Sequence, residues 1–217
     1  MQVVFACAIL LLGAGCKIVY DDERERGAAG GGGGAARSGG FDAAAWSAEV
    51  WETKVLAHFA QEAVGLPEVL GALQAGADEA GEKFGRRADA EGSPWSFTVR
   101  GKGRVKSVNT QSRAGTVVVA VDTPSGPQEV TLQIGPVVRG TAVRDSLPFF
   151  GFGDVTNQIE FAQVARALNQ RAVAGLKEQV EGVEPGTVVE FTGAMNVSGA
   201  DDPVLITPIT LKRAGEG

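Results

Sequence analysis

Apolar residues between positions 46 and 73 recur at the spacing of amphipathic helices. One stripe occupies every fourth position: Trp51, Val55, Phe59 and Ala63. This spacing places side chains on one face of a helix, and Asp42 is a favourable N-cap for its start. A second short helix is predicted from Leu66-Pro67, because proline is favoured in the first turn. A third is predicted to run to Phe84, with Asp78 as its cap.

Trp46, Trp51 and His58 lie in the first of these helical segments. One interpretation is that they line a ligand site. The interpretation we favour places the two tryptophans in the core and His58 on the helix surface, since large aromatic residues at helical spacing usually pack inside a protein.

After Gly92-Ser93-Pro94 the pattern changes to short, β-branched runs separated by turn residues. Strands are predicted over residues 95–108, 116–122, 130–134, 137–143, 187–197 and 204–212. Gly101 and Gly103 interrupt the first run, and glycines inside strands mark bulges or sharp bends such as those at barrel corners. The continuous apolar run at 116–122 indicates a buried strand.

Another amphipathic helix is predicted before the last two strands. Asn157, with Glu160 three residues later, is a capping-box-like start. Its apolar seam consists of Phe161, Val164, Ala165, Leu168, Ala172 and Leu176. The order of these elements predicts an α+β fold in which N-terminal helices pack on a small OB-like β-barrel with an inserted helix. A split sheet packed by helices is the alternative.

The N-terminal segment has the pattern of an export signal. Residues 2–15 carry no charge and are too few to span a bilayer as a stable helix, so residues 1–15 are predicted to be a signal peptide. Gly13-Ala14-Gly15-Cys16 resembles the bacterial lipobox, which predicts lipidation of Cys16 and a membrane-anchored protein of the periplasm. The alternatives are an ordinary cleaved signal and a buried N-terminal strand.

A tether follows the predicted lipid site. Residues 21–40 are rich in glycine and charge and bury too little apolar surface to fold. Residues 16–40 are therefore assigned to the lipidated cysteine and a flexible tether, and twenty such residues span about 25 Å. Residues 41–217 are predicted to form a single α+β domain, with helices in 41–91 and the barrel with its inserted helix in 92–213.

Composition excludes several classes of function. The 217-residue chain has a net charge of −6, whereas nucleic-acid binding requires a basic face. It contains one histidine and two cysteines, both in the leading segment. This inventory argues against multi-histidine and cysteine-based metal sites and against a Ser-His-Asp enzyme. We therefore expect no metal, no cofactor and no nucleic-acid partner.

The candidate binding residues lie between positions 139 and 158. Arg139 and Arg144 flank Gly140-Thr141, and a bidentate arginine suits a carboxylate or phosphate. On an extended chain the two arginines point to opposite faces, so the alternative is a structural ion pair with Asp145 or Glu160. Thr141 completes this part of the candidate site.

A glycine-rich loop follows with three aromatic residues: Phe149, Phe150 and Phe152. Loops seldom expose so much apolar area. The loop is predicted either to fold under and plug the barrel or to form a lip that binds a partner or a ligand. Asn157 and Gln158 are uncharged polar residues that suit sugar hydroxyls, and they equally suit a solvated helix face.

Several blocks of the chain occur in the order of a known family. These are Cys16-Lys17-Ile18-Val19, Ala45-Trp46, Lys54-Val55-Leu56, Gly92-Ser93-Pro94-Trp95, Arg113-Ala114-Gly115-Thr116, Gln133-Ile134-Gly135-Pro136, Arg139-Gly140-Thr141 and Phe152 to Ala167. In these blocks the chain resembles the predicted periplasmic lipoproteins of proteobacteria, a family of unknown function. The resemblance implies an envelope lipoprotein whose genes often neighbour those of sugar-type ABC transporters. It implies no activity and no catalytic residues.

Two functions agree with these features. The first is a membrane-tethered accessory or binding module linked to sugar-type solute uptake, with a transporter component or a small polar solute as its partner. The second is a structural lipoprotein that docks on an envelope protein through the aromatic loop. We do not expect an enzyme, although Asp145, Asp154 and Glu160 are candidate acids for a glycosidase, which needs two carboxylates.

Overall fold

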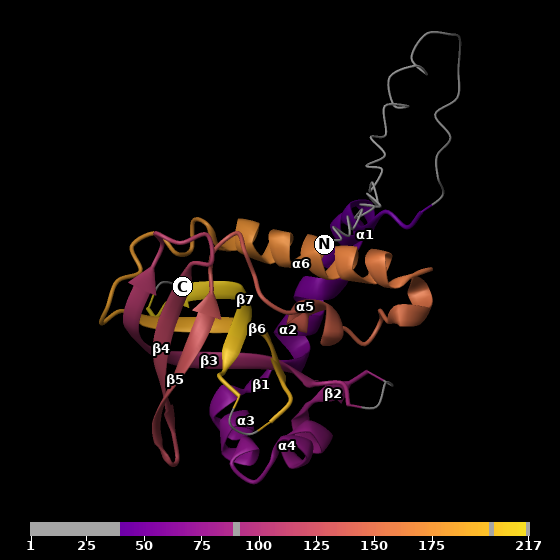
Figure 1. Ribbon diagram of the computed structural model, residues 1–217. Coiled ribbons are helices and arrows are strands. Elements are labelled where there is room, and N and C mark those ends of the chain that lie inside the picture. Colours follow the sequence, from indigo (N-terminus) through magenta and orange to yellow (C-terminus); the bar gives the residue numbers. More distant parts are fainter. Residues whose placement is uncertain (1–39, 89–91, 200–201, 216–217) are drawn as a thin grey trace, which may run out of the picture. The chain divides into compact units, whose positions relative to one another are not determined.

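Five strands that follow the helical segment pair in a closed ring. The computed structural model describes residues 40–88, 92–199 and 202–215 (Figure 1). In it, β3 (Trp95–Asn109) pairs antiparallel with β4 (Thr116–Thr123), and β4 with β5 (Gly126–Gln133). β5 lies parallel to β7 (Leu205–Arg213), and β7 pairs antiparallel with β6 (Val188–Val197). The ring closes because β6 also pairs antiparallel with β3.

The described residues belong to one compact unit, which extends over residues 39–217. The predicted signal segment 1–15, the lipid site Cys16 and the tether as far as residue 39 lie outside the described residues.

Strand β3 is long enough to pair with both β6 and β4 along different parts of its length. Trp95 to Arg104 pair with β6, and Gly103 to Asn109 pair with β4, so the strand has both partners only at residues 103 and 104. A Cβ at Gly103 would lie 2.3 Å from the carbonyl oxygen of Ala120, and one at Gly101 would lie 2.5 Å from the ring of Phe191. The two glycines therefore permit the close approach predicted at a barrel corner.

The N-terminal helices form as predicted, with one irregularity. α1 (Ala43–Val50), the π-helix η2 (Trp51–Val55) and α2 (Leu56–Glu62) follow one another without a break. The Asp42 side chain accepts a hydrogen bond from the N–H of Ala45 at 2.9 Å, which confirms the predicted cap. All four residues of the predicted stripe are buried.

The rest of the helical segment differs from expectation in two ways. α3 (Leu66–Leu73) begins with proline in its first turn, but α4 (Ala77–Phe84) has Gly76 at its N-cap, so the predicted cap at Asp78 is wrong. Asp78 instead accepts a hydrogen bond from Trp95 Nε1 at 2.8 Å. The short strands β1 (Val64–Gly65) and β2 (Arg86–Arg87) also pair with β3. A two-residue strand has no periodicity, so the sequence pattern did not indicate them.

The strand predicted over residues 137–143 is wrong. The chain leaves the sheet after β5, and the N–H groups of Ile134 and Gly135 both bond to the carbonyl of Gly115. Gly140 has a φ of +84°, and the short helix α5 (Ala142–Asp145) follows. The β-branched run at 137–143 therefore does not form a strand. Tertiary packing buries Ala142 and Val143 as part of a helix, and such packing overrides local strand propensity.

The inserted helix α6 (Gln158–Leu176) is confirmed between β5 and β6. Asn157 caps it by accepting hydrogen bonds from the N–H groups of Ile159 and Glu160, each at 3.0 Å. The seam residues from Val164 to Leu176 are buried. In Figure 1, α6 lies on the opposite side of the ring from α3 and α4.

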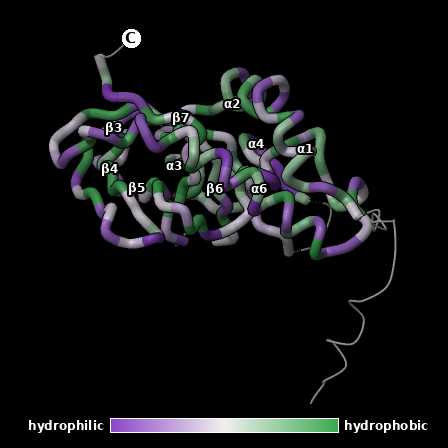
Figure 2. The backbone as a smooth tube through the Cα atoms, turned by 90° about the horizontal axis from the view of Figure 1, so that it is seen from above, coloured by the Kyte–Doolittle hydropathy of each residue, from purple (hydrophilic) through white to green (hydrophobic). Residues whose placement is uncertain are grey.

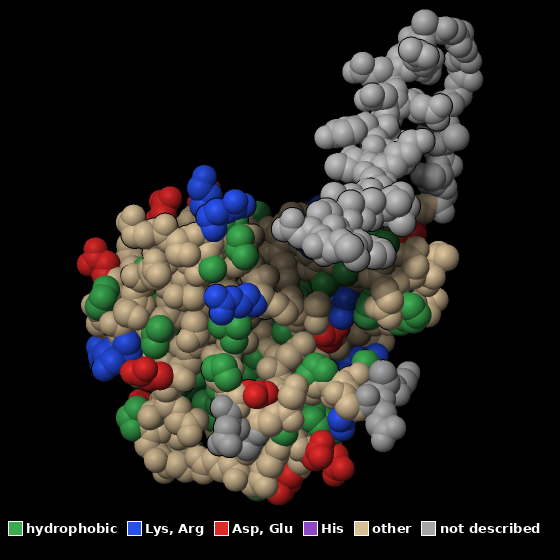
Figure 3. Space-filling model, viewed as in Figure 1, with side chains coloured by type: hydrophobic (Ala, Val, Ile, Leu, Met, Phe, Trp, Pro, Cys, Tyr) green, Lys and Arg blue, Asp and Glu red, His purple; other side chains and the backbone are tan. Residues whose placement is uncertain are grey.

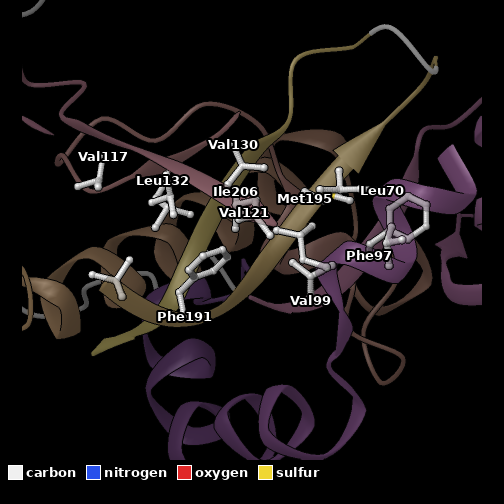
Figure 4. Packing of buried hydrophobic residues seen from close by; sticks show 14 of the residues in the cluster. Leu70, Phe97, Val99, Val117, Val121, Val130, Leu132, Phe191, Met195 and Ile206 are labelled. Atoms are coloured by element: carbon white, nitrogen blue, oxygen red, sulfur yellow. The ribbon is translucent and has the colours of Figure 1, made fainter. Parts of the chain in front are cut away.

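Two clusters of buried residues make up the core. The inner cluster fills the ring with side chains such as Phe97, Phe191 and Met195, and Leu70 of α3 joins it (Figure 4). The second cluster lies outside the ring, where α1, η2, α2, α5 and α6 pack on β6 and β7. Viewed from above, hydrophobic and hydrophilic residues are interspersed along the chain (Figure 2). In β4 the apolar run is continuous, but half-buried and buried positions alternate from Thr116 to Val121, which is the pattern of a sheet with one buried face.

Candidate functional site

Helix α5 builds a hydrogen-bond network around the carboxylate of Asp145. Thr141 Oγ1 donates to Asp145 Oδ2 at 2.5 Å, and Asn196 Nδ2 donates to the same oxygen at 3.1 Å. Arg144 donates to Asp145 Oδ1 through Nε at 2.8 Å and through Nη2 at 2.5 Å. Both oxygens are thus committed, and the ion pair holds the arginine head in one orientation.

Arg144 is also fixed from its other side. Its Nη1 donates to the carbonyl of Phe161 at 3.0 Å, and its guanidinium carbon lies 3.5 Å from the centroid of the Phe161 ring. The side chain is 10% exposed. Of the two alternatives for this arginine, the structural ion pair with Asp145 is the one present. The premise that Arg144 sits on an extended chain is wrong, because the residue belongs to α5.

The three phenylalanines of the loop have different environments. Phe150 is buried in the second cluster, with ring centroids 4.5 Å from Trp46 and 5.9 Å from Phe161. Phe149 is half-buried, and Lys54 Nζ lies 5.7 Å from its ring centroid. Phe152 is 47% exposed and stands edge-on to Phe161. The prediction that the loop plugs the barrel is wrong, because Phe150 packs outside the ring.

A cavity of about 610 Å³ opens beside this network. Five of the predicted binding residues line it: Thr141, Arg144, Phe150, Phe152 and Gln158. Phe161 and Asp145 complete that wall. We call this the solute cavity. The lining combines aromatic rings with hydroxyl, amide and guanidinium groups, a mixture typical of sites for small polar ligands.

The other predicted residues lie elsewhere. Arg139 is exposed and does not line the solute cavity. Its backbone N–H and carbonyl are both bonded to the side chain of Gln133. Asn157 uses its side-chain oxygen to cap α6. Phe149 lines a neighbouring groove instead of the solute cavity.

The opposite wall of the solute cavity was not predicted. It consists of Arg86, Arg87, Ser93, Pro94 and Ser96, from β2, the following loop and the start of β3. Arg87 binds Asp78 and the carbonyl of Ser93, whereas Arg86 is exposed and has no ion pair among the described residues. The adjacent arginines after α4 were the signal in the sequence, but only the pairing of β2 with β3 brings them to α5.

The only histidine lies in the neighbouring groove, which shares Arg86 and Ser96 with the solute cavity. His58 Nε2 lies 3.2 Å from the hydroxyl of Thr98. Burial lowers the pKa of His58 below its ordinary 6.5, while nearby Glu62 and a hydrogen bond with the backbone of Ser146 oppose this effect. The imidazole of His58 is half-buried, so this residue is not the free surface residue that we expected.

The three candidate acids are all engaged in structural hydrogen bonds. Asp145 belongs to the α5 network, and Asp154 accepts the N–H of Gly151 at 2.7 Å. Glu160 accepts the N–H groups of Thr156 at 2.8 Å and Phe41 at 3.1 Å, and these bonds lower its pKa. Among the described residues, no group of three or more His, Cys, Asp or Glu side chains could hold a metal. No helix in the described ranges is both long and apolar enough to cross a membrane.

Comparison with known proteins agrees with the fold. The model of one family, described as "Predicted periplasmic lipoprotein (DUF2291)", matches residues 6–212. The chain belongs to this family. The protein is thus a bacterial envelope lipoprotein of the periplasm. The resemblance inferred from the ordered blocks is confirmed.

One solved structure supports the architecture independently. An OB-fold protein from Thermotoga maritima superimposes with a TM-score of 0.64 at 19% identity, covering 80% of this chain and 99% of that protein. At this identity the similarity shows the fold alone, and it confirms the OB-like prediction. Comparison with curated proteins finds no match.

Proposed function

We propose that this lipoprotein is a tethered binding module that holds a small polar solute of the sugar type in the solute cavity, as an accessory to a transporter. The observation that supports this most is the convergence of five predicted residues on one cavity. Exposed ring area on Phe152 suits the apolar face of a sugar, while Ser93, Ser96, Thr141 and Gln158 offer hydroxyl and amide partners.

The cations of the cavity favour a solute that carries a carboxylate. Arg86 has no ion pair among the described residues, so its guanidinium is available to an anionic group. Arg144 is already paired with Asp145 and contributes mainly a fixed surface with Phe161. Sugar acids are therefore expected to bind more tightly than the corresponding neutral sugars.

A thermal-shift screen of the purified protein against sugars, sugar acids, polyols and nucleosides tests this proposal. A solute present at a hundred times its Kd stabilises the protein by about 2.7 kcal/mol, which a melting curve resolves. The shift should disappear in Phe152→Ala and Gln158→Ala, whose side chains are exposed and not needed for the fold. Gln170→Ala, on the solvated side of the same helix, is the matched control. A flat screen on a cooperatively melting protein would contradict the proposal.

Docking on an envelope protein is the second candidate, and one observation favours it. The described residues include three exposed large apolar side chains; one of them, Ile159 (71%), lies in the first turn of α6, and another, Phe152 (47%), lies in the loop that precedes this helix. A photocrosslinking side chain at Ile159 should capture a defined envelope protein, such as a transporter component. The same group at Gln170 should not. Identical products from both positions would remove the support for this docking surface.

A further inference from the structure

A second, larger hollow lies on the outer face of the ring. Its volume is about 950 Å³, and its lining residues come mainly from β3, β6 and β7. It shares no residue with the solute cavity or with the groove of His58. We call it the cationic groove, because five of its lining residues are basic: Arg100, Lys102, Arg104, Lys106 and Lys212.

The strand geometry explains why the cations gather there. Arg100, Lys102 and Arg104 are alternate residues of β3, so their side chains leave the strand on the same face, and all three are exposed. The positions between them are Gly101 and Gly103, which carry no side chain. Alternate residues on a strand are about 6.6 Å apart, so the three charges form a row of about 13 Å.

The row is continued across the neighbouring strands. Lys102 lies opposite Glu190 of β6, and Glu190 lies opposite Lys212 of β7. The only acidic lining residues are Glu190 and Asp122. Lys102 and Glu190 form an ion pair at 2.8 Å, but both side chains are more than half exposed, so water screens the pair. Positive charge therefore predominates in this groove of a chain whose net charge is −6.

Much of this positive charge is available to a ligand. The side-chain ammonium groups of Lys106 and Lys212 have no hydrogen bond or ion pair within the described ranges. Arg100 donates one Nη1 hydrogen to the carbonyl of Ala63, and Arg104 donates one to the carbonyl of Gly186 at 2.9 Å. These bonds orient the guanidinium groups and leave their other N–H groups unused. Such preorganisation lowers the cost of binding an anion.

The groove offers charge but no aromatic platform. Phe191 is its only aromatic lining residue, and it is 3% exposed. Stacking of a base or a sugar ring is thus excluded as the basis of recognition. Arginine forks and lysine ammonium groups together are the usual partners of phosphate oxygens. We propose that the cationic groove binds a ligand with two or more phosphate groups, supplied either by phospholipid headgroups of a membrane surface or by a soluble phosphate compound.

Matched charge variants of the full chain test this proposal. The groove variant carries Lys102→Gln, Arg104→Gln and Lys106→Gln. The control carries Arg113→Gln, Arg166→Gln and Lys177→Gln, whose side chains are exposed, have no ion pair within the described residues and lie outside the groove. Both variants lose three positive charges, so non-specific electrostatic effects are equal. Far-UV circular dichroism and melting curves establish that both variants are folded.

Tripolyphosphate in calorimetry is the soluble probe, and phosphatidylglycerol vesicles in flotation are the membrane probe. The groove variant should bind at least one probe about tenfold more weakly than the control, because three charge contacts are lost. The effect should diminish with salt. A loss with vesicles alone identifies headgroups as the source, and a loss with tripolyphosphate identifies a soluble compound.

Two results would overturn the proposal. One is equal binding of both probes by the groove variant and the control. The other is groove-dependent binding of a single-stranded oligonucleotide that is tighter than the binding of either phosphate probe. Because the groove and the solute cavity share no residue, neither result bears on the solute-binding proposal.

Discussion

Glu160 joins two distant parts of the chain through a single carboxylate. Its Oε1 accepts the N–H of Phe41 and its Oε2 accepts the N–H of Thr156, so the start of the folded part is tied to the start of α6. The sequence correctly indicated a glutamate in the first turn of this helix. The reciprocal bond to the N–H of Asn157 is replaced by the bonds to Thr156 and Phe41, which no local pattern predicts.

Glu160→Gln should destabilise the protein in a pH-dependent way. The N–H bonds lower the pKa of Glu160 below its ordinary 4.5 in the folded state. Its stabilising contribution is therefore fully present above pH 4.5 and is lost as the pH falls through the folded-state pKa. Melting curves from pH 7 to pH 3 should show a Tm difference between wild type and variant that is largest near neutrality and shrinks in acid. The exposed Glu178→Gln is the control, and a constant difference across the range would contradict this role.

Among the elements, β3 shows how glycine enables a strand to change partners. At Gly103 the strand pairs with β6 on one side and β4 on the other, and the backbone of Ala120 approaches too closely for a side chain. The short strands β1 and β2 attach to the same element and bring Arg86 to the solute cavity. The strand itself was predictable from its composition, whereas its number of partners depends on the closure of the ring.

Gly103→Ala should lower the free energy of unfolding by about 1–3 kcal/mol, because the added methyl group must displace backbone of β4. Gly175→Ala in α6 is the matched control. No atom lies within 4 Å of its added Cβ, so the same substitution should stabilise the helix by about 0.5–1 kcal/mol. Urea unfolding of both variants measures the two effects. The same sign of change in both would show that close packing at Gly103 is not the cause.

At the scale of the whole molecule, the two core clusters share the strands β6 and β7. Met195 and Leu211 face the inner cluster, while Ala194 and Ile209 of the same strands face the second cluster. Because each strand contributes to both, neither cluster has a sheet of its own. The described domain should therefore unfold as one cooperative unit.

Phe59→Ala in the second cluster and Phe97→Ala in the inner cluster should each destabilise the protein by about 3–5 kcal/mol, since both rings are buried. Fluorescence and circular dichroism can follow the unfolding of each cluster, because Trp46 and Trp51 lie with the second cluster and Trp95 lies with the inner one. The transitions from single-tryptophan variants should coincide. Phe152→Ala, at an exposed ring, should change stability by about 0.5 kcal/mol or less. Separate transitions for the two tryptophan groups would contradict a single unit.

The sequence predicted which residues could belong to the candidate site, but not which of them would line the same cavity. Thr141, Arg144, Phe150, Phe152 and Gln158 lie close together in the chain, so a loop beside a helix brings them to one place. Arg139 was a reasonable candidate for the same reason, yet it does not line the cavity, and the chain turns directly after it at Gly140. Arg86, Arg87 and Ser96 are more than forty residues from the loop in the sequence, and no periodicity connects them to it.

The sequence by itself determined the periodic elements, the helix caps at Asp42 and Asn157, the OB-like order of strands and helix, and membership of a family of periplasmic lipoproteins. Each of these depends on residues that are neighbours in the chain or on their order. Only the tertiary structure decided that residues 142–145 form a helix, that Arg144 is paired with Asp145, and that the solute cavity and the cationic groove are separate. These features arise from contacts between segments brought together by the closure of the ring, and their free energy comes from burial and pairing that no local pattern records.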